Sequence, residues 1–366
     1  MLLGLDAEFG NKTSTADDAI QAGIEIAIEE VNRSGGVLGG RPLQLVIRDN
    51  RGIPARGVDN LRELASLKDM TAVFGSKFSA VLLAQVALAH ELRVPLLDPW
   101  AAADGIVNHG YKPSYTFRLS LRDGWAMPFL LKEAQRRGFK KIGVLLPNGD
   151  WGRSNRRAVE EYLAANPGPF VVKFVGFEWS DTSLADEYLD LLRAGAEAVL
   201  VVGNEPEVAL LVTAMKALPR TQWRPLLSHW GAAAGNLPAL TGPGIFDVDL
   251  SIVQTFSFIR NPTPRSKRVL EAAMALLKVS EPRGVVSPPG VAHAYDLTHL
   301  LARAIDKAGT TDREKVRDAL EKLGPYEGLV KHYHQPFSRD RHEALGPEQL
   351  FMARWRSDGV LVPSSQ

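Results

Sequence analysis

The sequence contains no cysteine among its 366 residues. Disulfides, thiol nucleophiles and thiolate metal sites are therefore excluded, although the redox compartment stays open. The sequence also has no excess of charge of either sign, because its 43 lysines and arginines nearly balance its 42 aspartates and glutamates. A polyanionic partner such as nucleic acid is thus not expected.

Long apolar runs are missing as well. The sequence contains no run of about 18 apolar residues, the length needed to span a bilayer, so we expect no direct membrane insertion. The chain enters a strand at residues 2–5 without a basic region followed by an apolar segment. We therefore expect that any export signal has been removed from this sequence. The length predicts two domains of roughly 150 to 180 residues, an arrangement that usually encloses a cleft.

Apolar patterns typical of strands and of helices alternate along the chain. Residues 15–34, for example, place Ile20, Ile24 and Ile28 on one helical face and end at a pair of glycines. Such alternation with short connections predicts an α/β fold with parallel sheets wrapped in helices. The expected strands are 43–48, 71–74, 95–97, 115–119, 142–146, 171–177, 198–202, 226–227, 249–258 and 349–355. The expected helices after the first are 57–67, 79–92, 125–137, 153–165, 184–194, 206–217, 265–278, 291–308 and 313–323.

The most informative segment is residues 73–102. It reads as a strand, a glycine turn, a helix headed by Ser79, and a second strand that opens onto a loop at Pro99 and Trp100. Such a unit presents backbone N–H groups and a hydroxyl at a helix N-terminus, where an anionic group such as a carboxylate is favoured. The segment therefore predicts a binding site without evident reaction chemistry.

Signatures of catalysis and of cofactors are not found. Residues 180–182 (Ser-Asp-Thr) lack the context of a nucleophile elbow, and no GxGxxG follows the first strand. His332 and His334 would lie on one face of a strand, but spacing sets no third ligand, and His342 follows in a loop. We expect no enzyme activity, no cofactor and no metal.

Four segments together resemble one known family. They are AGIEIAIEEVNRSGGVLGGRPLQLVIRDN (22–50), VFGSKFSAVLLAQVALAHELRVPLLDP (73–99), KKIGVLLPNGDWGRSNRRAVEEYL (140–163) and AHAYDLTHLLARAI (292–305). In these segments the chain resembles the type I periplasmic solute-binding proteins of ABC importers, in the branch of the branched-chain amino-acid (Leu/Ile/Val) binding proteins. The order of the segments extends the resemblance over almost the whole chain.

The resemblance implies two Rossmann-like, doubly wound domains joined by three crossover strands, with a ligand held in the cleft between them. It puts the crossovers near residues 119–123, 254–258 and 329–337. The N-terminal lobe would comprise residues 1–120 and 257–330, and the C-terminal lobe residues 121–256 and 331–366. Ligands at the carboxyl ends of strands also follow the general rule for open α/β sheets.

By the same resemblance, Phe78 and Ser79 receive the carboxylate of the ligand, and the loop with Trp100, Ala101 and Ala102 completes that subsite. Ser79 could alternatively act as a helix N-cap, and the two roles are compatible. Lys77, which precedes Phe78, could complement an anion or could simply be solvated.

The chain departs from the amino-acid-binding pattern at two positions. The family usually carries a hydroxyl where Ala102 stands, and an acidic partner for the ligand's ammonium near His229 and Trp230, where no carboxylate is present. An ammonium buried without a partner is costly. Either Glu205 or Glu8 replaces that charge, or the ligand has no ammonium. Asn204, Glu205 or His229 would complete the contacts from the second domain.

Aromatic residues fall on several loops that the resemblance directs at the cleft. Rings around a small cavity suit a flat or branched apolar ligand, and the alternative is that one or two of them serve as core or hinge packing. These residues are Phe9, Phe78, Trp100, Trp151 and Trp230.

The sequence thus predicts a non-catalytic, monomeric, periplasmic solute-binding protein, located at the outer face of the cell membrane if it carries a lipid anchor. It would close by hinge bending on a hydrophobic amino acid or an aromatic or other organic acid and deliver it to a membrane permease. One alternative is a ligand-sensing regulator of the same fold. An upstream signal peptide in the gene product would favour import over that role. A third possibility, an α/β enzyme, has little support in the residues.

Overall fold

The computed structural model describes residues 1–10, 15–166, 171–260 and 262–364. The chain divides into two compact units. Of the described residues, unit 1 comprises 1–10, 16–121 and 262–346, and unit 2 comprises 15, 122–166, 171–260 and 347–364. Each unit is built around its own mainly parallel sheet, so the prediction of two α/β domains is confirmed.

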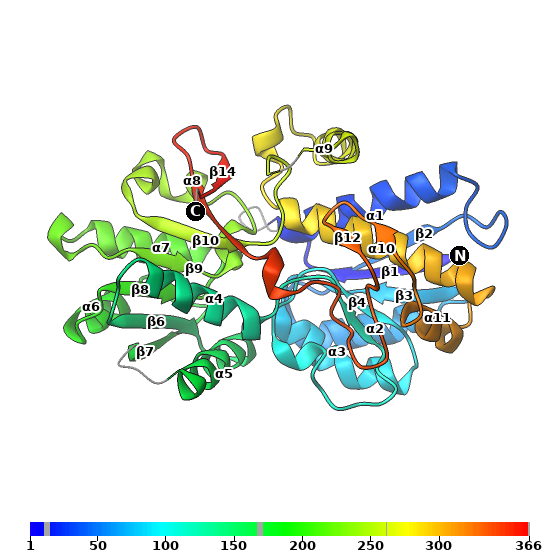
Figure 1. Cartoon of the computed structure of the whole chain (residues 1–366), viewed down its shortest axis with the longest axis horizontal. Coiled ribbons are helices and arrows are strands. Elements are labelled where there is room, and N and C mark those ends of the chain that lie inside the picture. The colour runs from blue at the N-terminus through cyan, green and yellow to red at the C-terminus, as the bar shows by residue number, and fades with distance from the viewer. Residues whose placement is uncertain (11–14, 167–170, 261, 365–366) are drawn as a thin grey trace. The chain divides into compact units, whose positions relative to one another are not determined.

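The sheet of unit 1 is parallel throughout, with the strand order β2-β1-β3-β4-β5. Helices α2 and α3 cover one face and α1 and α10 the other (Figure 1), which explains why the central strands are nearly continuous apolar runs. The strands are β1 (Leu2–Ala7), β2 (Gln44–Asp49), β3 (Met70–Phe74), β4 (Leu96–Asp98) and β5 (Thr116–Arg118). The helices are α1 (Ala16–Arg33), α2 (Pro54–Ser66), α3 (Ser79–Glu91), α9 (Pro264–Leu276), α10 (Pro288–Ala308) and α11 (Arg313–Leu320), and a hairpin of β11 (Tyr326–Glu327) and β12 (His332–Tyr333) follows them.

The sheet of unit 2 has the strand order β14-β13-β10-β9-β8-β6-β7. Strands β10, β9, β8, β6 and β7 are parallel, whereas β13 and β14 add an antiparallel edge. The strands are β6 (Ile142–Pro147), β7 (Val171–Phe177), β8 (Ala198–Val201), β9 (Leu226–Ser228), β10 (Leu250–Gln254), β13 (Phe351–Trp355) and β14 (Leu361–Pro363). The helices are α4 (Asp123–Arg136), α5 (Asp150–Ala165), α6 (Ala185–Arg193), α7 (Glu205–Lys216) and α8 (Leu237–Thr241).

The observed unit boundaries differ from the predicted lobes near the C-terminus. Residues 331–346 belong to unit 1, and the last passage between the units falls at residues 346–347 instead of at the predicted third crossover, 329–337. The reason is pairing with β5: the N–H of Arg118 donates to the His342 carbonyl, and the N–H of Ala344 donates to the Arg118 carbonyl, both at 2.8 Å. Residues 257–260 likewise belong to unit 2, where the guanidinium of Arg260 lies over the ring of Phe351.

Element boundaries shift by a few residues from those expected, and two shifts affect the site. Helix α5 begins at Asp150 instead of residue 153, so Trp151 lies in its first turn. Strand β10 ends at Gln254 and is shorter than the apolar run that predicted it. Strand β14 was not predicted. Among the described helices, none is both long and apolar enough for a bilayer.

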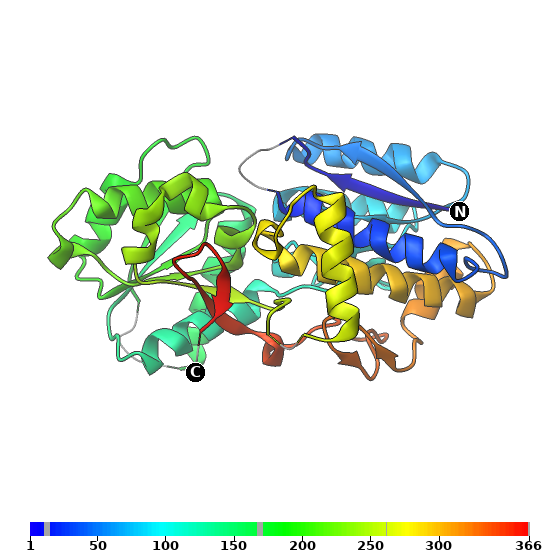
Figure 2. The same cartoon turned by 90° about the horizontal axis from the view of Figure 1, so that it is seen from above.

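Helices α1 and α10 of unit 1 lie side by side (Figure 2), and α10 buries most of its residues. Their close approach depends on Gly23 of α1. A methyl group at this position would lie 2.2 Å from the carbonyl oxygen of Val291 in α10. The carbonyl of Val291 belongs to the helix backbone and cannot move aside as a flexible side chain can. Any residue with a Cβ at position 23 would therefore force the two helices apart.

We therefore expect Gly23→Ala to destabilise the protein by about 1–3 kcal/mol, in spite of the higher helix propensity of alanine. Gly324→Ala is the matched control, because a methyl group there meets no atom within 4 Å. Urea denaturation of both variants measures the effect. Equal stability of the two variants would contradict the packing argument.

Candidate functional site

The predicted site residues of unit 1 follow neighbouring parallel strands at their carboxyl ends. Glu8 and Phe9 follow β1, residues 77–79 follow β3, and residues 100–102 follow β4. Because β1, β3 and β4 are adjacent in the sheet, the three loops meet at one edge. Asp17, at the start of α1, links two of them, since its carboxylate accepts hydrogen bonds from the N–H groups of Glu8 and Lys77, each at 2.9 Å.

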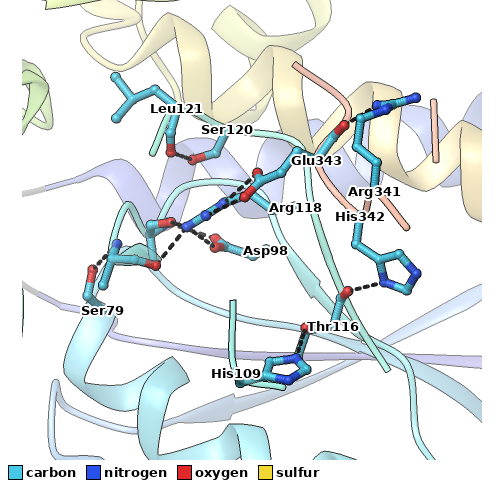
Figure 3. A network of polar contacts seen from close by, with 12 residues as sticks. Ser79, Asp98, His109, Thr116, Arg118, Ser120, Leu121, Arg341, His342 and Glu343 are labelled. Carbon is cyan, nitrogen blue, oxygen red and sulfur yellow. Dashed lines mark hydrogen bonds and ion pairs between the residues drawn. The ribbon is translucent and has the colours of Figure 1, made fainter. Parts of the chain in front are cut away.

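The loop of residues 99–103 is held by buried polar side chains beneath it. Asp98 accepts hydrogen bonds from the N–H groups of Trp100 at 3.0 Å and Ala101 at 2.7 Å. Arg118 donates to the carbonyl oxygens of Ala101 at 3.3 Å and Ala103 at 2.8 Å. Figure 3 shows the Arg118 guanidinium among these groups, with Asp98 on one side. The backbone of the loop is thus fixed by groups that are not themselves exposed.

Arg118 is fully buried and pairs with Glu343 through two hydrogen bonds, of 2.9 Å from Nε and 2.6 Å from Nη2 (Figure 3). Burial by itself lowers the pKa of an arginine, but the Glu343 carboxylate more than offsets this, and the pKa of Arg118 is raised. The ion pair of Arg118 with Asp98 is longer, because Oδ2 of Asp98 lies 3.9 Å from Nη1 of the guanidinium. Glu343 is therefore the principal counter-ion.

Two further side chains hold carbonyl groups of the same loop. Ser120 donates to the Trp100 carbonyl at 2.9 Å, and Nδ1 of His293 in α10 lies 3.0 Å from the Pro99 carbonyl. Burial lowers the pKa of His293 to about 4, so the ring is neutral at physiological pH and donates from Nδ1.

Ser79 is the first residue of α3, and the N-cap residue is Phe78, which makes no side-chain capping bond. The alternative that Ser79 serves as the N-cap is therefore wrong. Its hydroxyl oxygen instead accepts a hydrogen bond from the N–H of Ala103 at 3.2 Å (Figure 3). No described residue accepts a hydrogen bond from the N–H of Ser79 or of Ala102. A buried hydroxyl next to two such donors suits an anion, and anion binding at this place stays a prediction.

Lys77 and Glu8 form an ion pair of 2.8 Å, and only 2% of the Lys77 side chain is exposed. Lys77 is thus not a solvated loop lysine, and its charge is matched within the unit. The same pairing means that Glu8 does not offer an uncompensated carboxylate to a ligand. The neighbouring Asp17 is fully buried, and burial raises its pKa to about 6.

In unit 2, the predicted residues again follow parallel strands at one edge of the sheet: Trp151 follows β6, Asn204 and Glu205 follow β8, and His229 and Trp230 follow β9. Asn204 is the N-cap residue of α7, and Glu205 is the fully buried first residue of that helix. The rings of Trp151 and His229 meet edge to face, 5.1 Å between centroids.

Asp123 is a buried carboxylate of this edge that sequence reasoning missed. Its Oδ1 accepts a hydrogen bond from Nε1 of Trp151 at 3.1 Å and lies 3.2 Å from Nε2 of His229. The side chains of both Asp123 and His229 are completely buried. The position of Asp123, directly after the passage between the units at residues 121–122, was the available signal, but its partners become visible only in the folded chain.

The aromatic residues differ in exposure. Trp100 and Trp230 are almost fully buried, at 3% and 1% exposed, whereas Phe9, Phe78 and Trp151 are half-buried. Trp100 packs toward Gly290 of α10, so it also contributes to the core. Contact of these rings with a ligand stays a prediction.

The histidines of the C-terminal segment have other partners. His332 lies 2.7 Å from a Glu327 oxygen, and His342 stacks on Phe117 and lies 2.6 Å from the Thr116 carbonyl. Within residues 1–10, 15–166, 171–260 and 262–364, no group of histidine and carboxylate side chains could hold a metal ion.

A cavity of about 450 Å³ lies in unit 2 between the end of α4 and strands β10, β13 and β14. Its lining includes Arg137, Asp249 and Trp355, and none of the predicted site residues contributes to it. Because it lies by the start of β10 and not by the carboxyl ends of the parallel strands, we do not assign the ligand to this cavity.

Asp98 should make the stability of the protein depend on pH. Burial raises its pKa to about 7 from an ordinary 3.8. Between these values the folded state keeps a proton that the unfolded state has lost, so Asp98 lowers stability progressively as pH rises from about 4 to about 7. We expect the free energy of unfolding of the protein, relative to Asp98→Asn, to fall by about 2–4 kcal/mol across this window.

Urea denaturation of both proteins from about pH 4 to pH 8 checks this expectation. The comparison with Asp98→Asn removes the contributions of Asp17 and other groups that titrate in both proteins. A difference that does not change with pH would mean that Arg118 keeps Asp98 ionised.

Comparison with known proteins places this architecture in a family. A family model described as periplasmic binding protein matches residues 10–360. The leucine-, isoleucine-, valine-, threonine- and alanine-binding protein of Pseudomonas aeruginosa is 27% identical over 304 residues, which cover 83% of this chain and 77% of that protein.

Two solved structures share the fold over the whole chain. One is the branched-chain amino-acid transporter substrate-binding protein of Streptococcus pneumoniae in complex with isoleucine, with a TM-score of 0.80, 21% identity and 99% of its chain covered. The other is a solute-binding protein of an R. palustris ABC transporter in complex with 4-hydroxybenzoate, with a TM-score of 0.82, 18% identity and 96% covered.

The relatives are solute-binding proteins and not enzymes, so the expectation of a non-catalytic protein is confirmed at the level of the family. The two-domain α/β architecture and the residues quoted for the resemblance agree with the same assignment. The chain belongs to the periplasmic binding protein family and has the type I fold.

Proposed function

We propose that the protein captures a small carboxylate-bearing solute with an apolar body and delivers it to the membrane permease of an ABC importer. The observation that carries the proposal is the arrangement in unit 1, where the Ser79 hydroxyl and the N–H groups of Ser79 and Ala102 adjoin a loop fixed from beneath. Carboxylates are bound by such donors at helix N-termini. Both hydrophobic amino acids and aromatic or other organic acids fit this description.

The family supports the solute class. The Pseudomonas aeruginosa relative is named for leucine, isoleucine, valine, threonine and alanine, and the two structural neighbours hold isoleucine and 4-hydroxybenzoate. All of these ligands carry a carboxylate. In most of them the rest of the molecule is apolar or aromatic. The half-buried rings of Phe9, Phe78 and Trp151 would enclose such a body.

In the proposed mechanism, the protein alternates between open and closed states. A ligand that contacts both units stabilises the closed state by the interactions that it makes only there, and its differential affinity sets the population. The protein would act as a monomer in the periplasm, or at the outer face of the membrane if it is lipid-anchored. The closed form would be the one that the permease recognises.

A screen by thermal unfolding tests the solute class directly. Candidates are branched-chain and aromatic amino acids and the corresponding deaminated acids. At about 100 times its dissociation constant, a ligand should stabilise the protein by about 2.7 kcal/mol. If no carboxylate-bearing solute stabilises the protein, the proposal is wrong and a sensor of another ligand class becomes the better interpretation.

For a ligand found in this way, Ser79→Ala should lower affinity by about 10- to 100-fold, because a hydrogen bond to a charged group is lost. Ser66→Ala is the control: Ser66 is an exposed helical serine whose hydroxyl donates to the Glu63 carbonyl. Isothermal titration measures both variants. Wild-type affinity in Ser79→Ala would show that the carboxylate is not received at the start of α3.

A further inference from the structure

A short segment of unit 1, residues 109–113, is attached to the rest of the fold through two histidine rings. In the described part of the chain, residues 109–114 form no backbone–backbone hydrogen bond with any other residue. The segment lies at the surface, and the ring of Tyr111 at its middle is 46% exposed. Ser114, which follows it, accepts a hydrogen bond from Arg317 on its carbonyl oxygen at 3.3 Å. The position of residues 109–113 therefore depends on side chains.

His109 holds the segment against strand β5. Its Nδ1 accepts a hydrogen bond from the N–H of Tyr111 at 3.1 Å and so carries no proton. The proton of the neutral ring lies on Nε2, which donates to the hydroxyl of the buried Thr116 in β5 at 2.8 Å (Figure 3). A second proton on Nδ1 would oppose the Tyr111 N–H, so this attachment requires a neutral ring.

His90, in the last turn of α3, meets the same segment in the same protonation state. Its Nδ1 donates to the Val86 carbonyl at 2.7 Å, and its Nε2 accepts a hydrogen bond from the N–H of Tyr115 at 3.0 Å. The ring of Tyr111 stacks on His90 at 4.4 Å between centroids and an angle of 22°. The rings of His90 and His109 also meet edge to face at 4.6 Å. A proton on Nε2 of His90 would oppose the Tyr115 N–H.

The electrostatic surroundings do not compensate a charge on either ring. Among the residues that the structure describes, neither His90 nor His109 has a carboxylate as a partner. A third histidine, His342, lies near both rings and directs its Nε2 at Glu321, 3.0 Å away. The other charged side chains around Tyr115 are paired with one another, Arg317 with Asp318 and Glu321, and Arg93 with Glu314.

The pKa shifts agree with this geometry. Burial lowers the pKa of His109 to about 4, and the neighbouring His90 and His342 contribute in the same direction. Burial also lowers the pKa of His90. Because the ring of Tyr111 is partly exposed, the cation–π attraction that it offers a protonated His90 is weak. A released ring takes up a proton below its ordinary pKa of 6.5, whereas the attached ring of His109 does not until about pH 4. The attachment therefore weakens progressively as pH falls through this window.

We propose that residues 109–113 form an acid-released flap, attached to α3 and β5 while His90 and His109 are neutral and detached when these rings gain protons. Both rings accept a hydrogen bond from the backbone at an end of the same short segment, so the release of one ring favours the release of the other. Release uncovers the side of α3 that carries His90. This response to acid is not required for the capture of a solute and does not rest on the proposed function.

Amide hydrogen exchange of the intact protein, followed by NMR and corrected for the intrinsic exchange rate, tests the proposal. With a pKa of 6.5 for the released His109, the protection of the Tyr111 amide should fall about 30-fold between about pH 7.5 and pH 5. The protection of the Tyr115 amide should fall with it. The amide of Val73 donates to the Pro95 carbonyl within the sheet and should keep its protection, because the opening is local.

A double variant, His90→Gln with His109→Asn, separates the two rings from the other groups that titrate. The side-chain oxygens of glutamine and asparagine can accept the hydrogen bonds of Tyr115 and Tyr111 and do not take up protons in this range. The double variant should therefore keep both amides protected at about pH 5. The matched control is His334→Asn, which removes an exposed histidine outside the flap and should keep the wild-type response.

Circular dichroism establishes that the variants are folded. If the double variant does not hold the flap at neutral pH, the wild-type protein decides, because the pH at which Tyr111 loses protection must coincide with protonation of the two rings in the NMR titration. Three results would overturn the proposal: wild-type protection of Tyr111 and Tyr115 that does not change with pH, an equal loss in a double variant that holds the flap at neutral pH, or a loss of Val73 protection in parallel, which would mean global unfolding.

Discussion

The buried ion pair between Arg118 and Glu343 is the interaction on which the candidate site of unit 1 depends. One guanidinium binds the carboxylate through two hydrogen bonds and also donates to two carbonyl oxygens of the loop that follows β4. Removing one partner of a buried ion pair costs about 3–5 kcal/mol, because the other charge stays buried. Backbone pairing of Arg118 with residues 342–344 places Glu343 beside the guanidinium, so the ion pair joins the C-terminal segment of unit 1 to the loop after β4.

This arrangement leaves few backbone groups of the loop without a partner. Asp98, Ser79, Ser120 and His293 bind groups that Arg118 does not reach. The N–H of Ala102 is left without an acceptor among the described residues, and it is held in place because its neighbours are fixed on both sides. A ligand meeting such a preformed donor does not have to order the loop, which lowers the entropic cost of binding.

Much of the fold could be predicted from the sequence because its signals are local. Alternating apolar patterns identified the strands and helices, and parallel topology then brought Ser79, Trp100, Trp151 and His229 to the sheet edges. The polar framework could not be predicted in this way. Arg118 and Glu343 are 225 positions apart, and Asp123 meets His229 through the packing of α4 beside β9, so neither pair has a spacing that a sequence pattern could reveal. The predicted third crossover was misplaced for the same reason, since the last passage between the units depends on the pairing of residues 342–344 with β5.

The charges of unit 1 explain why its donors suit an anion under the proposed function. Lys77 is matched by Glu8 and Arg118 by Glu343, so the donors near Ser79 are left to receive an anion. In unit 2, the buried Asp123 carboxylate lies against Trp151 and His229 at the edge where the parallel strands end. Under the proposed function, a ligand favours the closed state only through the free energy of contacts that it makes in that state alone.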